Sequence, residues 1–185
     1  MGVRCFVAME VEEADILDAI GRVQAGLMGT GADLKAVERE NIHLTMRFLG
    51  DVGEGLLEEV KGLVSGVRFD AFPMELEGVG VFPNLGRPRV VWVGVTTGAE
   101  ELKGIFSRLE PALVEMGFKP ERRGFSPHIT IARVRSGRNR AQLVDEVLSF
   151  QGETFGGFEV KHIRLKKSVL TPRGPVYSTL AESQT

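Results

Sequence analysis

The sequence predicts an α+β protein with two similar lobes that face each other across a cleft. Short turns join most of the predicted strands, which favours antiparallel sheets. Segments with apolar residues at every third or fourth position alternate with these strands, so helices should cover the outer face of each sheet. Two segments about half a chain apart share one pattern, which predicts that the lobe is repeated.

The predicted elements run in the order strand, helix, strands, helix, strands, and then much the same again. Strands are expected at 3–11, 34–37, 42–52, 72–83, 89–95, 126–135, 158–170 and 176–182. Helices are expected at 12–28, 54–67, 98–118 and 139–150. Pro111 lies inside the third helix, so this helix should either kink or consist of two abutting helices. No Pro- or Ser-rich linker divides the chain, and residues 1–185 are expected to form a single bilobal domain.

Composition describes an ordinary globular chain of 185 residues, 43% apolar and 26% charged. No apolar run approaches the roughly 20 residues that a membrane span needs, so no membrane partner is expected. The N-terminal segment lacks the pattern of a cleavable signal, which makes the cytoplasm the expected compartment. The only cysteine, Cys5, lies in an apolar strand and is expected to be a small core residue. We expect the protein to act as a monomer.

The net charge of −2 conceals an asymmetry along the chain. Residues 1–118 hold 11 basic and 19 acidic residues, whereas residues 119–185 hold 12 basic and 6 acidic ones. The densest basic stretch runs from Lys119 to Arg140. It is either a solvated face with counterions or a local attraction for phosphate. The overall charge argues against a non-specific nucleic-acid binder of high affinity, which needs many phosphate contacts.

Two predicted strands carry the same unusual pattern, a histidine followed two residues later by a threonine. The first, "NIHLTMRFLG", contains His43 and Thr45, and the second, "SPHITIARVR", contains His128 and Thr130. Because side chains alternate along a strand, each histidine shares a face with its threonine, ~6.5 Å away. The same alternation puts Arg47 on the His43 face. If the repeated lobes face each other, the two pairs meet across the cleft.

This arrangement suits in-line displacement at phosphorus. A neutral imidazole can activate the attacking hydroxyl or water while an imidazolium protonates the leaving oxygen, and each role is commonly worth ~10²–10⁴ in rate. Threonine hydroxyls can hold the non-bridging oxygens without adding charge. No metal is required. A metal site would need three or four ligands, which this set does not supply, and His162, without such a threonine, is expected on an exposed strand face.

The segments "HLTMRFLG" and "PHITIARV" resemble the paired His-x-Thr motifs of the 2H phosphoesterase superfamily. Within it, the chain is most similar to the RNA 2′,3′-cyclic phosphodiesterases, also described as 2′-5′ RNA ligases. The likeness extends over nearly the whole chain and includes "RCFVAMEV", "RVVWVGV" and "SVLTPRGPVYSTL". The paired motifs are its specific part.

The resemblance implies two antiparallel-rich sheets with outer helices, related by pseudo-two-fold symmetry around a central cleft. It implies an enzyme without a cofactor that opens 2′,3′-cyclic phosphates at RNA ends to 2′-phosphates. His43 matches the family's proton donor and His128 its acceptor, and Thr45 and Thr130 match its threonines. The expected partner is RNA with 2′,3′-cyclic phosphate ends, tRNA fragments among them. An enzyme that mainly joins tRNA halves through a 2′,5′ linkage and a non-enzymatic binder of RNA ends stay open as alternatives.

Two arginines are further candidates for substrate binding. Arg133 resembles an arginine commonly found after the second motif, but simple alternation points it away from His128 unless a bulge intervenes. Arg47 is favoured by alternation. For both, a surface ion pair is the alternative. Phe48, Phe125 and Trp92 could stack a base, although aromatic residues on strands are more often in the core.

Overall fold

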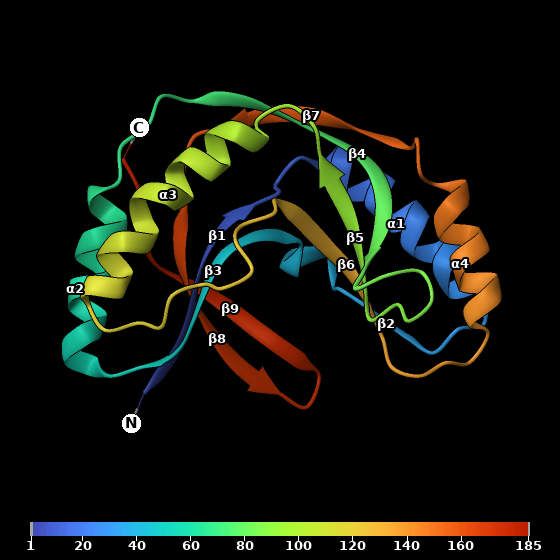
Figure 1. The fold of residues 1–185 in the computed structure, drawn as a ribbon, viewed down its shortest axis with the longest axis horizontal. Helices are drawn as coiled ribbons and strands as arrows, with labels where there is room; N and C mark the ends of the chain where they lie inside the picture. The colour runs from blue at the N-terminus through green and yellow to red at the C-terminus, as the bar shows by residue number, and fades with distance from the viewer. Residues whose placement is uncertain (1, 185) are drawn as a thin grey trace.

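The protein consists of two antiparallel sheets with helices on their outer sides (Figure 1). The computed structural model describes residues 2–184. The four-stranded sheet has the order β3-β1-β8-β9, and the five-stranded sheet has the order β2-β6-β5-β4-β7. The four-stranded sheet is formed by β1 (Val3–Glu10), β3 (His43–Val52), β8 (Arg164–Thr171) and β9 (Gly174–Glu182). The five-stranded sheet is formed by β2 (Leu34–Ala36), β4 (Phe72–Phe82), β5 (Val90–Val95), β6 (His128–Val134) and β7 (Thr154–Val160).

Four helices flank the sheets, and their apolar stripes face inward. They are α1 (Ala14–Gly29), α2 (Glu54–Gly66), α3 (Ala99–Glu115) and α4 (Arg140–Ser149), and the 3₁₀ turn η1 (Arg39–Asn41) precedes β3. Helices α1 and α4 lie against the five-stranded sheet, whereas α2 packs on β8 and β9 with α3 beside it (Figure 1). Helix α3 runs through Pro111, so the alternative of two abutting helices is wrong. None of the helices within residues 2–184 is long and apolar enough to cross a membrane.

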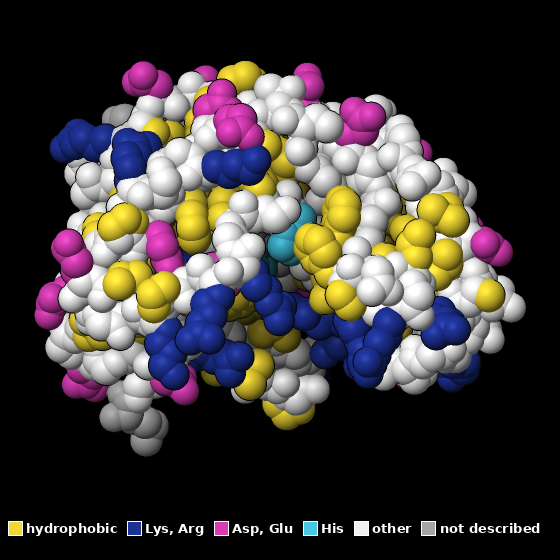
Figure 2. Space-filling view, in the orientation of Figure 1, with side chains coloured by type: hydrophobic (Ala, Val, Ile, Leu, Met, Phe, Trp, Pro, Cys, Tyr) yellow, Lys and Arg dark blue, Asp and Glu magenta, His cyan; other side chains and the backbone are white. Residues whose placement is uncertain are grey.

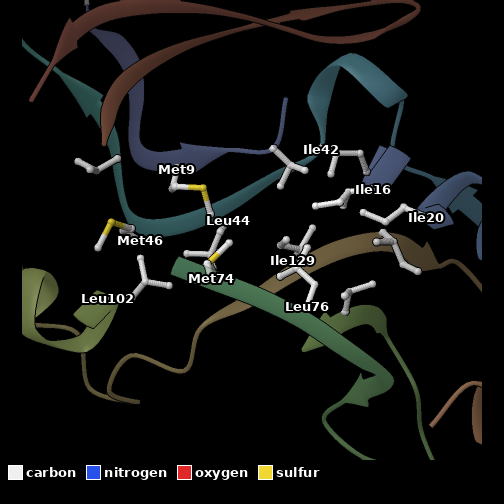
Figure 3. Close-up of a cluster of buried hydrophobic side chains, with 14 of the residues drawn as sticks. Met9, Ile16, Ile20, Ile42, Leu44, Met46, Met74, Leu76, Leu102 and Ile129 are labelled. Atoms are coloured by element: carbon white, nitrogen blue, oxygen red, sulfur yellow. The ribbon is translucent and has the colours of Figure 1, made fainter. Parts of the chain in front are cut away.

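A single hydrophobic cluster joins the two sheets. Met9 and Leu44 of the four-stranded sheet meet Met74 and Ile129 of the five-stranded sheet in this cluster (Figure 3). Cys5 is buried in the same core, as predicted. Because apolar burial of this kind is the main favourable term in folding, the core fixes the two lobes and the strands that carry the motifs against each other. The predicted α+β class with two lobes is confirmed.

The strand expected at 158–170 is wrong in extent. Strand β7 ends at Val160 and β8 begins at Arg164, and the two belong to different sheets. His162 therefore lies in the connecting segment and not on a strand face, with Nδ1 at 3.0 Å from the Ser183 carbonyl oxygen. Ile163 is completely buried at the crossing. The apolar residues Phe158 and Val160 are out of phase with Ile163 and Leu165, and this break in the alternation marks the passage from β7 to β8.

Candidate active site

The first motif begins strand β3. His43 lies opposite Glu10 of β1, and Thr45 lies opposite Ala8. The His43 Nδ1 is 2.7 Å from the Asn41 carbonyl oxygen, which can only accept, so this nitrogen carries the proton of the neutral ring. Nε2 then accepts from the Thr45 hydroxyl at 2.8 Å. A hydrogen bond thus joins the His43 and Thr45 side chains on one side of the strand.

A β-bulge follows directly and reverses the expected place of Arg47. The register slips after Thr45, so that Arg47 lies opposite Val7 and Phe48 lies opposite Phe6. Since directly opposed residues share a face of the sheet, Arg47 turns away from the His43 face and Phe48 joins it. Placing Arg47 beside His43 by alternation was therefore wrong.

The Arg47 side chain is instead enclosed beside helix α3. Its Nε donates to Glu110 Oε2 at 2.7 Å, its Nη1 donates to the Phe48 carbonyl at 2.8 Å, and its Nη2 donates to the Lys119 carbonyl. Only 10% of the Arg47 side chain is exposed. These contacts tie β3 to α3 and to the chain that follows it.

The second motif repeats the arrangement on strand β6. His128 lies opposite Gly94 and Thr130 lies opposite Trp92, both on β5. The His128 Nδ1 is 2.7 Å from the Ser126 carbonyl oxygen, so here too Nε2 is the nitrogen left for chemistry.

The bulge that Arg133 needed is present. The register of β6 slips after Thr130, which puts Arg133 opposite Val90 and on the same face as Thr130 and His128. Burial lowers the pKa of His43 and raises that of Tyr177, and the Arg133 charge adds to the first effect and partly opposes the second, although both residues belong to the other sheet. Arg133 therefore lies at the junction of the two lobes.

The two histidines have different surroundings. The His43 ring packs against Phe6 and Tyr177, with ring centroids 5.0 and 5.4 Å apart. Burial lowers the pKa of His43, and the Asn41 hydrogen bond and the Glu10 charge partly oppose this effect. The His128 and Phe82 rings pack edge to face, with centroids 4.9 Å apart.

The motif strands meet where the lobes join. Strands β3 and β6 are in contact, and histidine side chains are visible in the hollow between the lobes (Figure 2). Lys and Arg side chains gather along the lower edge of this hollow (Figure 2). Arg138 and Arg140, which belong to the basic stretch, also bind the Gly31 and Gly86 carbonyls at 3.0 and 2.9 Å. These two arginines hold loops in place in addition to adding charge.

The three aromatic candidates lie in different environments. Phe48 is 63% exposed on the His43 face. Phe125 stacks on Phe106, with ring centroids 4.9 Å apart. The Trp92 indole lies on Gly80, where a Cβ atom would come within 2.3 Å of the ring. Phe48 is thus the one of the three that a ligand can reach most easily.

Sequence reasoning missed the polar residues around His43. Glu10, Lys166 and Tyr177 line a small cavity next to this ring. Glu10 gave one signal, since it is an acidic residue that directly follows the apolar run of residues 5–9. Lys166 and Tyr177 come from β8 and β9, and only the sheet order brings them close. Within residues 2–184, no group of three or more His, Cys, Asp or Glu residues is arranged to hold a metal ion.

Comparison with known families identifies the fold. The family described as "LigT like Phosphoesterase" matches residues 11–92 and again residues 93–177, one match for each half of the chain. The chain belongs to this family. The 2H phosphoesterase resemblance of the sequence is confirmed, and the repeat with it.

Relatives and solved structures of this family match along most of the chain. An "RNA 2',3'-cyclic phosphodiesterase" of Aeropyrum pernix is 44% identical over 88% of this chain and 93% of the relative. A protein of the same name from Methanothermobacter thermautotrophicus is 38% identical over 97% of both chains. The crystal structure of TT0787 of Thermus thermophilus matches with a TM-score of 0.79 and 27% identity over 97% of this chain and 96% of that chain. Escherichia coli LigT complexed with 3′-AMP has the same fold, with a TM-score of 0.81 and 24% identity over 98% of this chain and 97% of that chain.

Proposed function

We propose that this protein opens 2′,3′-cyclic phosphates at RNA ends to 2′-phosphates by two-histidine acid–base catalysis, without a metal ion. The protein is an enzyme, a hydrolase of phosphoric diesters, as its curated relatives are named. One observation carries the mechanism: two His-x-Thr pairs occupy equivalent places on strands that touch across the lobes. The cytoplasm remains the expected compartment and a monomer the expected state.

The proposed reaction forms one bond to phosphorus and breaks another. The His128 Nε2 takes a proton from water as its oxygen attacks phosphorus, and the His43 Nε2 gives a proton to O3′ as the P–O3′ bond breaks. The product carries a 2′-phosphate and a free 3′-hydroxyl. The family resemblance supports this division of roles. Burial favours the neutral form of His43 in the free protein, and the negative charge of a bound phosphate favours its protonated form.

The remaining candidates would hold the phosphate. Thr45 donates to His43 in the free protein, and its hydroxyl can turn to a non-bridging oxygen when substrate binds. Thr130 has the equivalent place on β6. Arg133 is on the same face and supplies a positive charge at the junction of the lobes. We do not assign Arg47 to substrate binding, because its guanidinium is engaged by Glu110 and by two carbonyls.

Hydrolysis of a 2′,3′-cyclic mononucleotide in excess EDTA tests the proposal. We expect a 2′-nucleotide as the only product and no loss of rate with the chelator. A 3′-nucleotide product would contradict the assigned leaving group. Full turnover by a His43→Ala, His128→Ala double variant would remove this site from consideration.

Ligation of RNA halves is the reverse of the same chemistry, with the histidine roles exchanged. The basic edge of the hollow supports it as a second candidate, because joining two strands requires binding of longer RNA (Figure 2). Incubation with an RNA that ends in a 2′,3′-cyclic phosphate and one that begins with a 5′-hydroxyl separates the two functions. A 2′,5′-linked product that outweighs the 2′-phosphate would favour ligation.

A further inference from the structure

An ion pair lies beside the His43 imidazole. Glu10, the last residue of β1, is paired with His43, the first residue of β3. Lys166 of β8 donates from Nζ to Glu10 Oε1 and, at 2.8 Å, to the Thr179 hydroxyl. Only 7% of the Lys166 side chain is exposed. Arg164 donates from Nη1 to the same Glu10 carboxylate.

The ion pair and the imidazole line one cavity of about 10 Å³. Phe6, Asn41 and Tyr177 form part of its wall. A space of this size holds about one water molecule at most. The ion pair and the imidazole therefore share a space too small for a nucleotide.

The two members of the pair act on His43 with opposite sign. Burial, the largest effect, lowers the pKa of His43; the Glu10 carboxylate raises it and the Lys166 ammonium lowers it further. Arg133 of β6 also lowers it, and Glu40 and Tyr177 are the other titratable groups that line the cavity. Charges act more strongly on one another when little water separates them.

Glu10 keeps its negative charge in this setting. Burial raises the pKa of Glu10, but the hydrogen bonds and charges of Lys166 and Arg164 outweigh this effect and hold the pKa below its ordinary value. A charged carboxylate therefore lies beside the imidazole, on the same face of the sheet and lining the same cavity.

We propose that the Glu10–Lys166 pair is a positioning element of the active site, which fills the space beside His43 and sets the balance of charge that its ring faces. The proposal deepens the proposed function and rests on it for the consequence in catalysis. It gives a role in the reaction to two residues that do not touch the substrate.

Titration of the histidine ring signals by NMR tests the pair without any substrate. The chain has three histidines, so His43→Ala and His162→Ala variants suffice to assign the signals. We expect the titration midpoint of His43 to move to lower pH in Glu10→Gln, to higher pH in Lys166→Met, and back toward the wild-type value in the double variant. The matched control is Glu12→Gln, which also removes a carboxylate bound to Arg164 but lies outside the cavity and should leave the midpoint unchanged.

Shifts in the same direction for both single variants, or shifts no larger than that of the control, would overturn the proposal. If Glu10→Gln fails to fold because it leaves Lys166 unpaired, Lys166→Met and the double variant still decide the question. In kinetics, the limb of the pH–rate profile that coincides with the His43 titration should move with it. A moving titration beside an unchanged profile would leave the charge effect standing and remove His43 from the proposed reaction.

Discussion

The two motif strands share one backbone arrangement but differ in their neighbours. In both, the residue three positions after the histidine has no partner in the register of the neighbouring strand: Met46 of β3 has none on β1, and Ile131 of β6 has none on β5. In both, the histidine Nδ1 lies 2.7 Å from the carbonyl oxygen two residues earlier. The repeat in the sequence therefore corresponds to a repeated local geometry, in which the same ring nitrogen, Nδ1, is held by a backbone carbonyl.

The differences lie in what each histidine faces. Glu10 is opposite His43, whereas Gly94 occupies the equivalent place opposite His128. After the bulge, Phe48 stands on the first strand where Arg133 stands on the second. The backbone thus provides two equivalent imidazoles, and the side chains around them provide the asymmetry that one acid and one base require.

The largest effects should follow from removing the imidazoles. We expect His43→Ala and His128→Ala each to lower kcat by about 10²–10⁴-fold, because each ring carries one proton transfer. The kcat of the double variant should be only slightly lower than that of the less active single variant, because both rings serve one step. Steady-state hydrolysis of a cyclic nucleotide measures this, with His162→Ala as an active control. A double variant that shows the full product of the two single losses would mean that the rings act independently.

Replacement of the threonines by valine keeps their shape and removes the hydroxyl. A hydrogen bond to a charged oxygen contributes about 1.5–3 kcal/mol, so we expect kcat/KM to fall roughly 10- to 100-fold in Thr45→Val and in Thr130→Val. Only Thr45→Val removes a bond to a histidine, so it alone should also move the pH–rate profile. Unchanged kcat/KM in both variants would exclude the threonines from phosphate binding.

Arg47 and Arg133 each follow the bulge of their strand, and we expect replacement of the first to affect stability and replacement of the second to affect activity. Arg47→Met leaves Glu110 enclosed without its partner and should lower the free energy of unfolding by about 3 kcal/mol, with KM unchanged. Arg133→Met should raise KM about tenfold, equivalent to about 1.4 kcal/mol, and leave unfolding unchanged. Urea denaturation and steady-state kinetics of both variants measure this. A raised KM in Arg47→Met together with a loss of stability in Arg133→Met would show that the bulges do not direct these side chains as described.

The smallest effect concerns pH and stability. Burial lowers the pKa of His43, so the folded protein holds the ring neutral where the unfolded chain already protonates it. This stability is fully present above the unfolded value of about 6.5 and is lost as the pH falls below it. A His43→Asn variant should therefore lose less stability than wild type on acidification through this range. Parallel curves of unfolding free energy against pH would contradict the burial of a neutral ring.

The sequence predicted the fold class and the shared faces of His43 with Thr45 and of His128 with Thr130, because alternation holds over so short a stretch. It failed at Arg47, because no glycine or proline marks the bulge at Met46. For Arg133 the need for a bulge could be stated, but its presence could not.

The sequence could not predict which residues the order of the strands brings together. Glu10, Lys166 and Tyr177 lie on β1, β8 and β9, and they surround His43 only because β1 lies between β3 and β8. Pairing of strands so distant in sequence leaves no local pattern. The strand expected at 158–170 fails for a different reason, because it ignores the change of phase in the apolar alternation between Val160 and Ile163, where the chain passes from one sheet to the other.

A crystal structure with adenosine 2′-phosphate bound would test most directly whether both motifs serve one phosphorus. We expect the phosphate between the two imidazoles, with Nε2 of His43 and Nε2 of His128 each at a hydrogen-bond distance of about 2.6–3.2 Å from its oxygens or from O3′. A phosphate held by one histidine alone, with the other ring directed elsewhere, would contradict the two-histidine mechanism.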